Sequence, residues 1–375
     1  MTVHNDVLED LNKLVPLQDK LQVTHRSVAE LFPFIVRIAI AIYDPETSVL
    51  KTYMHSSGDD NPLEHYSARI DDAPSLKEIL KTGLPRVINN MLTFEGEGSE
   101  HSRRLGRYGY AASYTMPMFN NGVFIGFIFF NSDKKDVFDE NTLRQIDTYG
   151  HLISLMVVNE ISAIRVLTAA VKTTGNITHI RDPETGSHLD RMSRYCRLIA
   201  NTIADKYQLD DGYIEHLFMF SPLHDIGKIG IPDEILLKPD QLDANEAEVM
   251  HTHSSLGKKM VDEILGNFGL ENIEYVDMLR NIAEFHHESV NGQGYPSGIG
   301  GEQIPLEARI VAVADVFDAL TSARPYKIAW SNEDAIGELK KLAGEKLDRD
   351  CVNALIENLD EVEQIQLRFR ENFYG

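Results

Sequence analysis

The sequence is poor in cysteine and has no long apolar run. Its two cysteines, Cys196 and Cys351, lie far apart in a chain of 375 residues. They therefore give no disulfide framework and no thiolate metal site. The best candidate for a membrane span, residues 31–43, is shorter than the roughly 18 residues required and contains Arg37.

Positive charge is also scarce. The chain has 36 lysines and arginines against 58 aspartates and glutamates, a formal net charge of −22. This balance argues against binding of nucleic-acid polymers or anionic membranes, but not against a small anionic ligand, because metal ions and a few local cations can reverse the field inside one pocket. Residues 1–13 lack the pattern of a signal peptide, so we expect a cytoplasmic protein.

The length predicts two domains, since one core rarely serves so many residues. Residues 30–130 mix strand-like and helical stretches, including two apolar runs joined by Asn121-Gly122, a hairpin signal. After Phe138 the periodicity is helical almost to the end. We expect an α+β domain over 1–150, a connecting helix over 151–175 and an all-α domain over 176–375.

The first part resembles a GAF domain in its order of elements and in the stretch "MPMFNNGVFIGFIFFNSDKKDVFDENTLRQI". This resemblance implies a sensory or dimerisation domain, with a small-molecule ligand and a homodimer as expected partners. A loose echo of the signature of cyclic-nucleotide-binding GAF domains comprises Asn131, Lys134, Phe138, Asp139 and Glu140. An ordinary loop and helix cap explain the same residues, and this is the favoured interpretation.

The second part contains a series of potential metal ligands. They are Glu184, His188, His224, Asp225, His253, His286, His287 and Asp315. Each alone has a bland explanation, but a carboxylate within the apolar stretch "VAVADVF" needs a cation or several donors. Adjacent pairs such as His286–His287 are awkward for one ion and natural for two, because neighbours on a helix point about 100° apart. Nitrogen and oxygen ligands without cysteine favour Fe or Mn.

These motifs resemble the HD-GYP subfamily of HD-domain phosphohydrolases, which hydrolyse cyclic di-GMP. The resemblance covers about residues 170–350 and includes "HDIGKIGIP", "HHESVNGQGYP" and "IPLEARIVAVADVFDALTSARPYK". It implies that the eight residues above are metal ligands, that Asp225 bridges two metals and that Glu184 adds a third. His251 lies outside the pattern and is expected on the surface.

The loop after the paired histidines departs from the family at one position. Asn291 stands where the family usually has Asp, and it supports the same turn. Gly292 and Gly294 allow the backbone to approach a ligand closely. Tyr295 either stacks on a nucleotide base or packs the loop, and both interpretations stay open.

Three cations lie beside the metal motifs. By resemblance, Lys228, Arg324 and Lys327 grip the phosphates of the substrate, and Lys228 and Asp225 take part in catalysis. Arg309 is either a fourth phosphate contact or part of a structural salt bridge.

The sequence thus predicts a metal-dependent phosphodiesterase that opens cyclic di-GMP to pGpG and, with a third metal, continues to GMP. One alternative is the same chemistry on 3′,3′-cyclic GMP-AMP. Another is a catalytically silent module that binds a nucleotide or a partner protein.

Overall fold

The computed structural model describes residues 6–58, 63–91, 108–177, 186–322 and 329–370. The chain divides into two compact units. The first comprises residues 1–162 with the short pieces 210–212 and 272–274, and the second comprises the remainder. The first is an α+β unit and the second is helical, as the sequence predicted.

The first unit is built on one antiparallel sheet in the order β3-β2-β1-β6-β5-β4. Its strands are β1 (Ile35–Asp44), β2 (Val49–Ser56), β3 (Ser67–Arg69), β4 (Arg86–Ile88), β5 (Ala112–Asn120) and β6 (Val123–Ser132). The predicted Asn-Gly hairpin joins β5 to β6, and both turn residues have positive φ, 48° at Asn121 and 82° at Gly122. This geometry suits the right-handed twist of the flanking strands.

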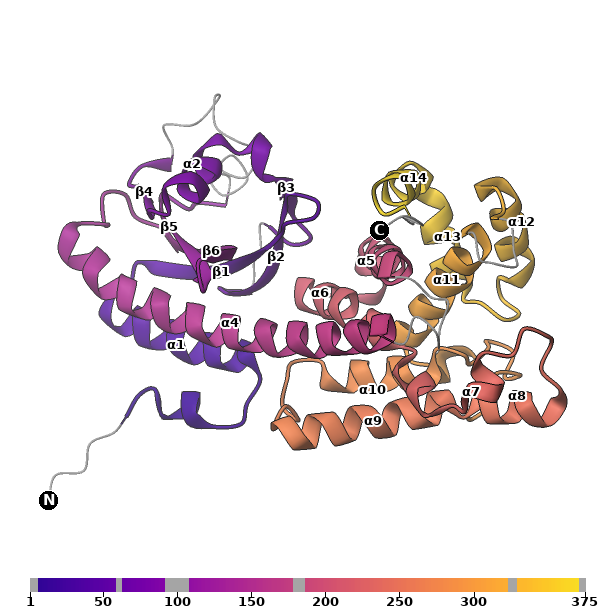
Figure 1. Cartoon of the computed structure of the whole chain (residues 1–375). Coiled ribbons are helices and arrows are strands. Elements are labelled where there is room, and N and C mark those ends of the chain that lie inside the picture. Colours follow the sequence, from indigo (N-terminus) through magenta and orange to yellow (C-terminus); the bar gives the residue numbers. More distant parts are fainter. Residues whose placement is uncertain (1–5, 59–62, 92–107, 178–185, 323–328, 371–375) are drawn as a thin grey trace, which may run out of the picture. The chain divides into compact units, whose positions relative to one another are not determined.

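Helices cover both faces of this sheet (Figure 1). One face carries α2 (Pro74–Thr82), which ends at Gly83 in the left-handed conformation, φ 70°. Alternate residues of β1 and β6, such as Ala39, Ala41 and Phe127, form a core with α2. The opposite face carries α1 (Leu17–Leu31) and the first part of α4 (Glu140–Ile177), the predicted long helix.

The echo of a cyclic-nucleotide signature has structural explanations here. Asn131 is buried in β6, where its side chain accepts from Arg37 and donates to Ser113. Asp139 accepts a hydrogen bond from the backbone N–H of Thr142 at 2.8 Å, which caps the start of α4. These contacts agree with the loop-and-cap interpretation.

The second unit is a helical bundle. Its helices after α4 are α5 (Gly186–Tyr207), α6 (Asp211–Phe220), α7 (Asp233–Leu236), α8 (Ala244–His251), α9 (His253–Phe268), α10 (Val276–Phe285), α11 (Leu306–Thr321), α12 (Asn332–Leu342), α13 (Arg349–Glu357) and α14 (Leu359–Arg368). Helix α11 is apolar along most of its length and packs against α5 and α10. The short 3-10 segment η5 (Ile226–Gly230) packs against α9.

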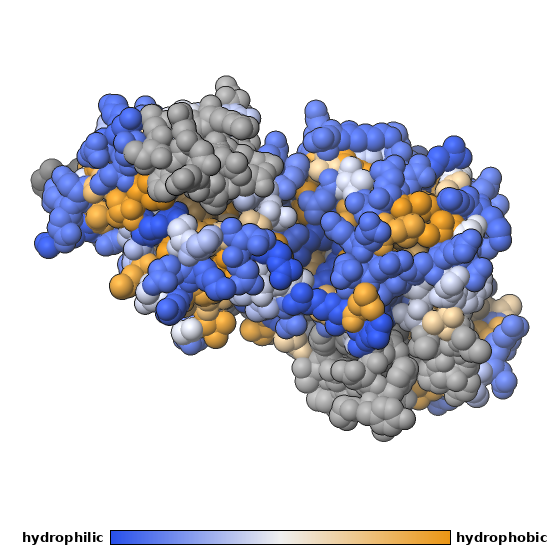
Figure 2. Space-filling view, turned by 90° about the horizontal axis from the view of Figure 1, so that it is seen from above, coloured by the Kyte–Doolittle hydropathy of each residue, from blue (hydrophilic) through white to orange (hydrophobic). Residues whose placement is uncertain are grey.

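Among the described residues, no helix combines the length and the apolar character needed to cross a bilayer. The face shown in Figure 2 is mostly hydrophilic, with small separate hydrophobic patches.

Candidate metal centre

Seven of the eight predicted ligands lie within the described residues, and the fold collects them into two groups in the second unit. Asp225, His253, His286 and His287 form one group, and His188, His224 and Asp315 form the other. Within each group the potential ligand atoms lie within 4.8 Å of one another. Residues from five separate stretches of the chain thus converge on one place. Glu184 falls outside the described residues.

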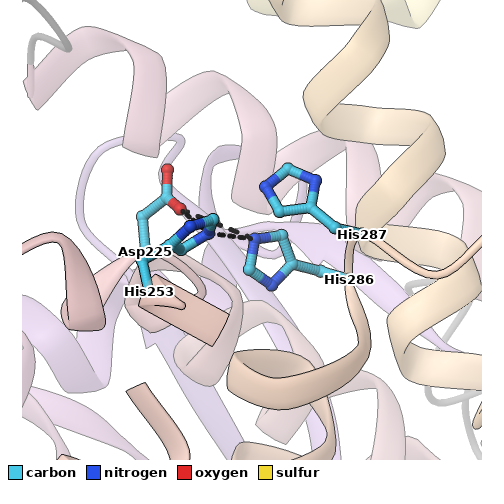
Figure 3. A group of neighbouring side chains, drawn as sticks. All are labelled: Asp225, His253, His286 and His287. Carbon is cyan, nitrogen blue, oxygen red and sulfur yellow. Dashed lines mark hydrogen bonds and ion pairs between the residues drawn. The ribbon is translucent and has the colours of Figure 1, made fainter. Parts of the chain in front are cut away.

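Asp225 stands between the two groups. Its Oδ1 lies 3.2 Å from Nε2 of His253 and 3.5 Å from Nε2 of His286, while its Oδ2 lies 3.2 Å from Nε2 of His224. Figure 3 shows the carboxylate beside the rings of His253 and His286. A carboxylate whose two oxygens face different sets of nitrogens has the geometry that a bridging ligand needs.

Backbone carbonyls fix the orientation of three histidines. The Nδ1 contacts are His224 to the carbonyl of Ser221 at 2.9 Å, His253 to that of Met250 at 2.8 Å and His286 to that of Ile282 at 2.9 Å. A carbonyl only accepts, so Nδ1 must carry the proton and Nε2 keeps its lone pair. Each Nε2 is directed towards the shared centre, as a metal ligand requires.

His188 reaches the centre from α5. Its Nε2 lies 3.8 Å from Oδ1 of Asp315 on α11, and its ring packs edge-on against that of His224. Its Nδ1 lies 2.7 Å from Oδ2 of Asp318. The sequence reasoning singled out Asp315 but missed Asp318, which lies one helical turn further along α11. The spacing of the two aspartates on an apolar helix was the available signal.

The protonation states suit metal binding. Burial alone would raise the pKa of Asp225, but Lys228, His224 and His253 outweigh it and hold that pKa well below its usual range. Burial lowers the pKa of His286 and lowers the pKa of His287 still further. The carboxylate is therefore charged and these imidazoles are neutral at neutral pH, the forms in which they coordinate a metal.

Gly227 brings two of the ligands together. A Cβ at this position would lie 1.9 Å from the carbonyl oxygen of His253 and 2.5 Å from the backbone nitrogen of Gly257. Only glycine therefore allows η5 to lie so close to α9. This contact places Asp225, two residues earlier in the chain, beside His253 at the start of α9.

The loop after His287 is shaped by its own polar groups. The carboxylate of Glu288 accepts from the backbone N–H groups of Ser297, at 2.6 Å, and Gly298, at 3.1 Å. Asn291 accepts from the N–H of Gln293 at 3.0 Å, so the asparagine supports the turn as expected. The exposed position of Asn291 explains why a change from Asp is compatible with the fold.

Tyr295 makes ring contacts within the protein. Its ring stacks on that of His251, with centroids 3.9 Å apart and planes 15° apart, and lies 4.8 Å from the ring of His287. His251 is exposed, as predicted, although it is engaged in this stack. The contacts agree with loop packing, and base stacking by Tyr295 stays a prediction.

The predicted cations differ in their surroundings. Nζ of Lys228 lies 2.6 Å from Oδ2 of Asp225, inside the centre. Arg309 is held by Asp348 at 2.7 Å and by the carbonyl of Ile304 at 3.0 Å, so it forms a structural salt bridge. Arg324 and Lys327 lie outside the described residues.

Comparison with known proteins identifies two domains. Residues 183–351 match the model of the HD domain, and residues 16–157 match that of the GAF domain.

Several curated proteins resemble about half of the chain. The cyclic di-GMP phosphodiesterase response regulator RpfG of Xanthomonas campestris is 44% identical over 185 residues, which cover 49% of this chain and 46% of that protein. A probable cyclic di-GMP phosphodiesterase of Vibrio cholerae is 39% identical over 51% of this chain and 44% of its own length. The 3′3′-cGAMP-specific phosphodiesterase 2 of Vibrio cholerae is 37% identical over 50% of this chain and 34% of its own length. The chain thus spans less than half of each of these relatives.

Proposed function

From a chain that joins a GAF domain to an HD domain of the type found in cyclic di-GMP phosphodiesterases, we propose a metal-dependent phosphodiesterase that hydrolyses cyclic di-GMP. The observation that carries the proposal is the carboxylate of Asp225, whose two oxygens face separate groups of histidines. The donor set is composed of nitrogen and oxygen without cysteine, which fits two Fe or Mn ions.

This geometry supports a separate role for the metals and for each nearby side chain. Two bound metals would lower the pKa of a water molecule and neutralise the charge that develops on the phosphate. The carboxylate of Asp225 lies between the two ligand groups and would contribute one oxygen to each. Lys228, next to Asp225, adds a positive charge that suits a non-bridging phosphate oxygen. By resemblance, Arg324 and Lys327 contribute further phosphate contacts, and Tyr295 contacts a base.

Glu184 is proposed to hold a third metal together with the His188 group. It precedes His188 by four residues in the sequence, and the resemblance to the HD-GYP subfamily implies a third-metal ligand at this place. Glu184→Ala should then spare the first cleavage, which yields pGpG, and slow the second, which yields GMP. The ratio of pGpG to GMP over time measures this effect, and an unchanged ratio would contradict the third-metal role.

The GAF domain is proposed to regulate the reaction through a small-molecule ligand. A cavity of about 340 Å³ lies beside β1 and β2, lined by Arg37, Lys51 and Arg69 with one acidic residue, Asp72. Burial lowers the pKa of Arg37 to about 10, so its guanidinium stays charged at neutral pH. The excess of positive charge favours an anionic ligand. A thermal-shift screen of nucleoside monophosphates on the full chain, with Arg37→Gln as control, tests this assignment.

A homodimer is also proposed, because the resemblance to GAF domains implies a dimerisation role. Light scattering on the purified chain would measure the mass directly. A monomer over the working concentration range would contradict it.

The decisive test is turnover by protein purified without oxygen. Cyclic di-GMP and 3′,3′-cyclic GMP-AMP would be offered separately and in competition, with the bound metals counted and the products resolved. Hydrolysis of cyclic di-GMP with at least two metals per chain supports the proposal.

The same experiment separates the alternatives. Preference for the mixed dinucleotide would move the substrate to that of the Vibrio cholerae relative specific for 3′3′-cGAMP. A folded protein that binds no metal and hydrolyses neither dinucleotide would instead be a catalytically silent binding module.

A further inference from the structure

The histidines of the two ligand groups are supported in different ways. His224, His253 and His286 each direct Nδ1 at a backbone carbonyl, a neutral acceptor. His188 directs its Nδ1 at the carboxylate of Asp318, at 2.7 Å. A hydrogen bond from Nδ1 to a carboxylate makes Nε2 a stronger electron-pair donor to a metal than a hydrogen bond to a carbonyl does. The reason is that the negative charge of the carboxylate stabilises positive charge on the imidazole.

Asp318 is itself fully buried, which would be costly without compensation. Arg191 on α5 supplies it with a paired contact, Nε to Oδ1 at 2.7 Å and Nη2 to Oδ2 at 2.8 Å. The hydroxyl of Ser322 donates to Oδ2 at 3.0 Å. The carboxylate is thus held in place by donors from two elements and cannot rotate away from His188.

Arg191 is fixed in turn. Its Nη1 donates to the carbonyl of Phe369 at 2.9 Å, and its Nη2 donates to the hydroxyl of Ser322 at 2.6 Å. Arg191 is 5% exposed, so the ion pair lies in a region of low dielectric. Contacts from α5, from the end of α11 and from the residue after α14 therefore hold the carboxylate of Asp318 in one orientation.

We propose that Asp318, held by Arg191, is a positioning residue that sets the metal affinity of the His188–His224–Asp315 group separately from that of the other group. The inference rests on the proposed metal-dependent function. Asp318 accepts the Nδ1 proton of His188, which fixes the tautomer with Nε2 facing the centre. In the Asp225–His253–His286–His287 group, Nδ1 of His253 and Nδ1 of His286 face backbone carbonyls, so loss of Asp318 acts on one position only.

The test uses Asp318→Asn, which keeps the size of the side chain and an oxygen that accepts the Nδ1 proton, but removes the charge. The full chain is stripped of metal and titrated with Mn²⁺ alone. Binding is followed by electron paramagnetic resonance, because two neighbouring Mn²⁺ ions couple magnetically and a single one does not. We expect one of two binding steps to weaken by roughly 10- to 100-fold while the other is unchanged, with loss of the coupled signal at low Mn²⁺.

A matched control removes a carboxylate from another buried ion pair of the same bundle. Glu215 pairs with Arg197 at 2.7 Å, each is 6% exposed, and Arg197 lies nine residues beyond His188 on α5. Glu215→Gln should cost similar stability and leave both Mn²⁺ steps intact. Equal weakening of both steps by Asp318→Asn, or no change in either, would overturn the inference.

Arg191→Lys keeps the proposal testable if Asp318→Asn does not fold. Lysine retains the charge but loses the paired geometry, so it should weaken the same step by a smaller factor. Two Mn²⁺ steps in a protein that hydrolyses no cyclic dinucleotide would refute the proposed function but leave this inference standing. Selective loss of one step in an active enzyme would support both.

Discussion

Both domains contain histidines whose rings are partly or fully buried, but the two domains engage the ring nitrogens differently. In the GAF domain, His25 uses both nitrogens locally, Nδ1 with the hydroxyl of Ser56 at 2.8 Å and Nε2 with the carbonyl of Ile35 at 3.1 Å. In the HD domain, His253 and His286 tie Nδ1 to a carbonyl and direct Nε2 at Asp225. A histidine with both nitrogens tied locally is a structural element, whereas one with Nε2 aimed at a shared carboxylate is prepared to bind a metal.

The largest effect is expected for Asp225→Asn. The amide removes the charge that faces both groups of histidines, so neither metal position is complete. Bound metal should fall below one ion per chain, and turnover should drop by more than the roughly 10- to 100-fold loss typical of residues outside the ligand set. Elemental analysis and product assays measure both. Near-normal turnover in a metal-loaded variant would remove Asp225 from the centre.

A second effect contrasts one glycine in each domain. Gly227 lies against α9, and a Cβ at Gly126 in β6 would lie 2.0 Å from the carbonyl oxygen of Ala41 in β1. Replacement by alanine should cost about 1–3 kcal/mol or more at either site, because neighbouring backbone must move. Gly227→Ala should also reduce metal loading, whereas Gly126→Ala should not. Calorimetry would measure the stability of both variants, and elemental analysis would count their bound metal. Equal metal loss in the two variants would contradict the role of Gly227 in bringing the ligands together.

A third effect concerns pH and the structural histidines. Burial lowers the pKa of His25 and that of His55, so the folded GAF domain resists a proton that the unfolded chain accepts. The free energy of unfolding should therefore fall as pH decreases below about 6.5, by at most about 1.4 kcal/mol per pH unit for each histidine. His25→Gln should flatten this slope in urea titrations between pH 7 and pH 5.5. His151→Gln, at an exposed position of α4, serves as control and should leave the slope unchanged.

The smallest effect is expected for His251→Ala. This ring stacks on Tyr295 but belongs to neither ligand group. The change should cost about 0.5–1.5 kcal/mol of stability and leave the metal count unaltered. A reduced metal count would show that the orientation of the ring nitrogens is an insufficient guide to the ligands.

Local chemistry made most of the fold predictable. Asn121-Gly122 predicted the hairpin, and Gly83 predicted the end of α2, because few residues adopt positive φ at low cost. The loop-supporting role of Asn291 followed from the same chemistry. These features depend on neighbours in the sequence.

Tertiary contacts were the part that the sequence did not reveal. Asp318 lies on α11, and its partners His188 and Arg191 lie on α5, more than 120 residues earlier. No local pattern specifies which faces of two helices meet. The resemblance to a family supplied the predicted ligands, and the structure supplied the contacts that orient their side chains. The roles of Glu184, Arg324 and Lys327 stay predictions.

The position of Asp225 also has a genetic consequence. Codons for aspartate and asparagine differ by one base, so a single transition at this codon would leave the volume of the side chain almost unchanged while both ligand groups lose their common charge. Such a change preserves packing around α9 and η5. A gene of this kind is thus one base change from encoding a chain of nearly unchanged packing in which neither metal position is complete.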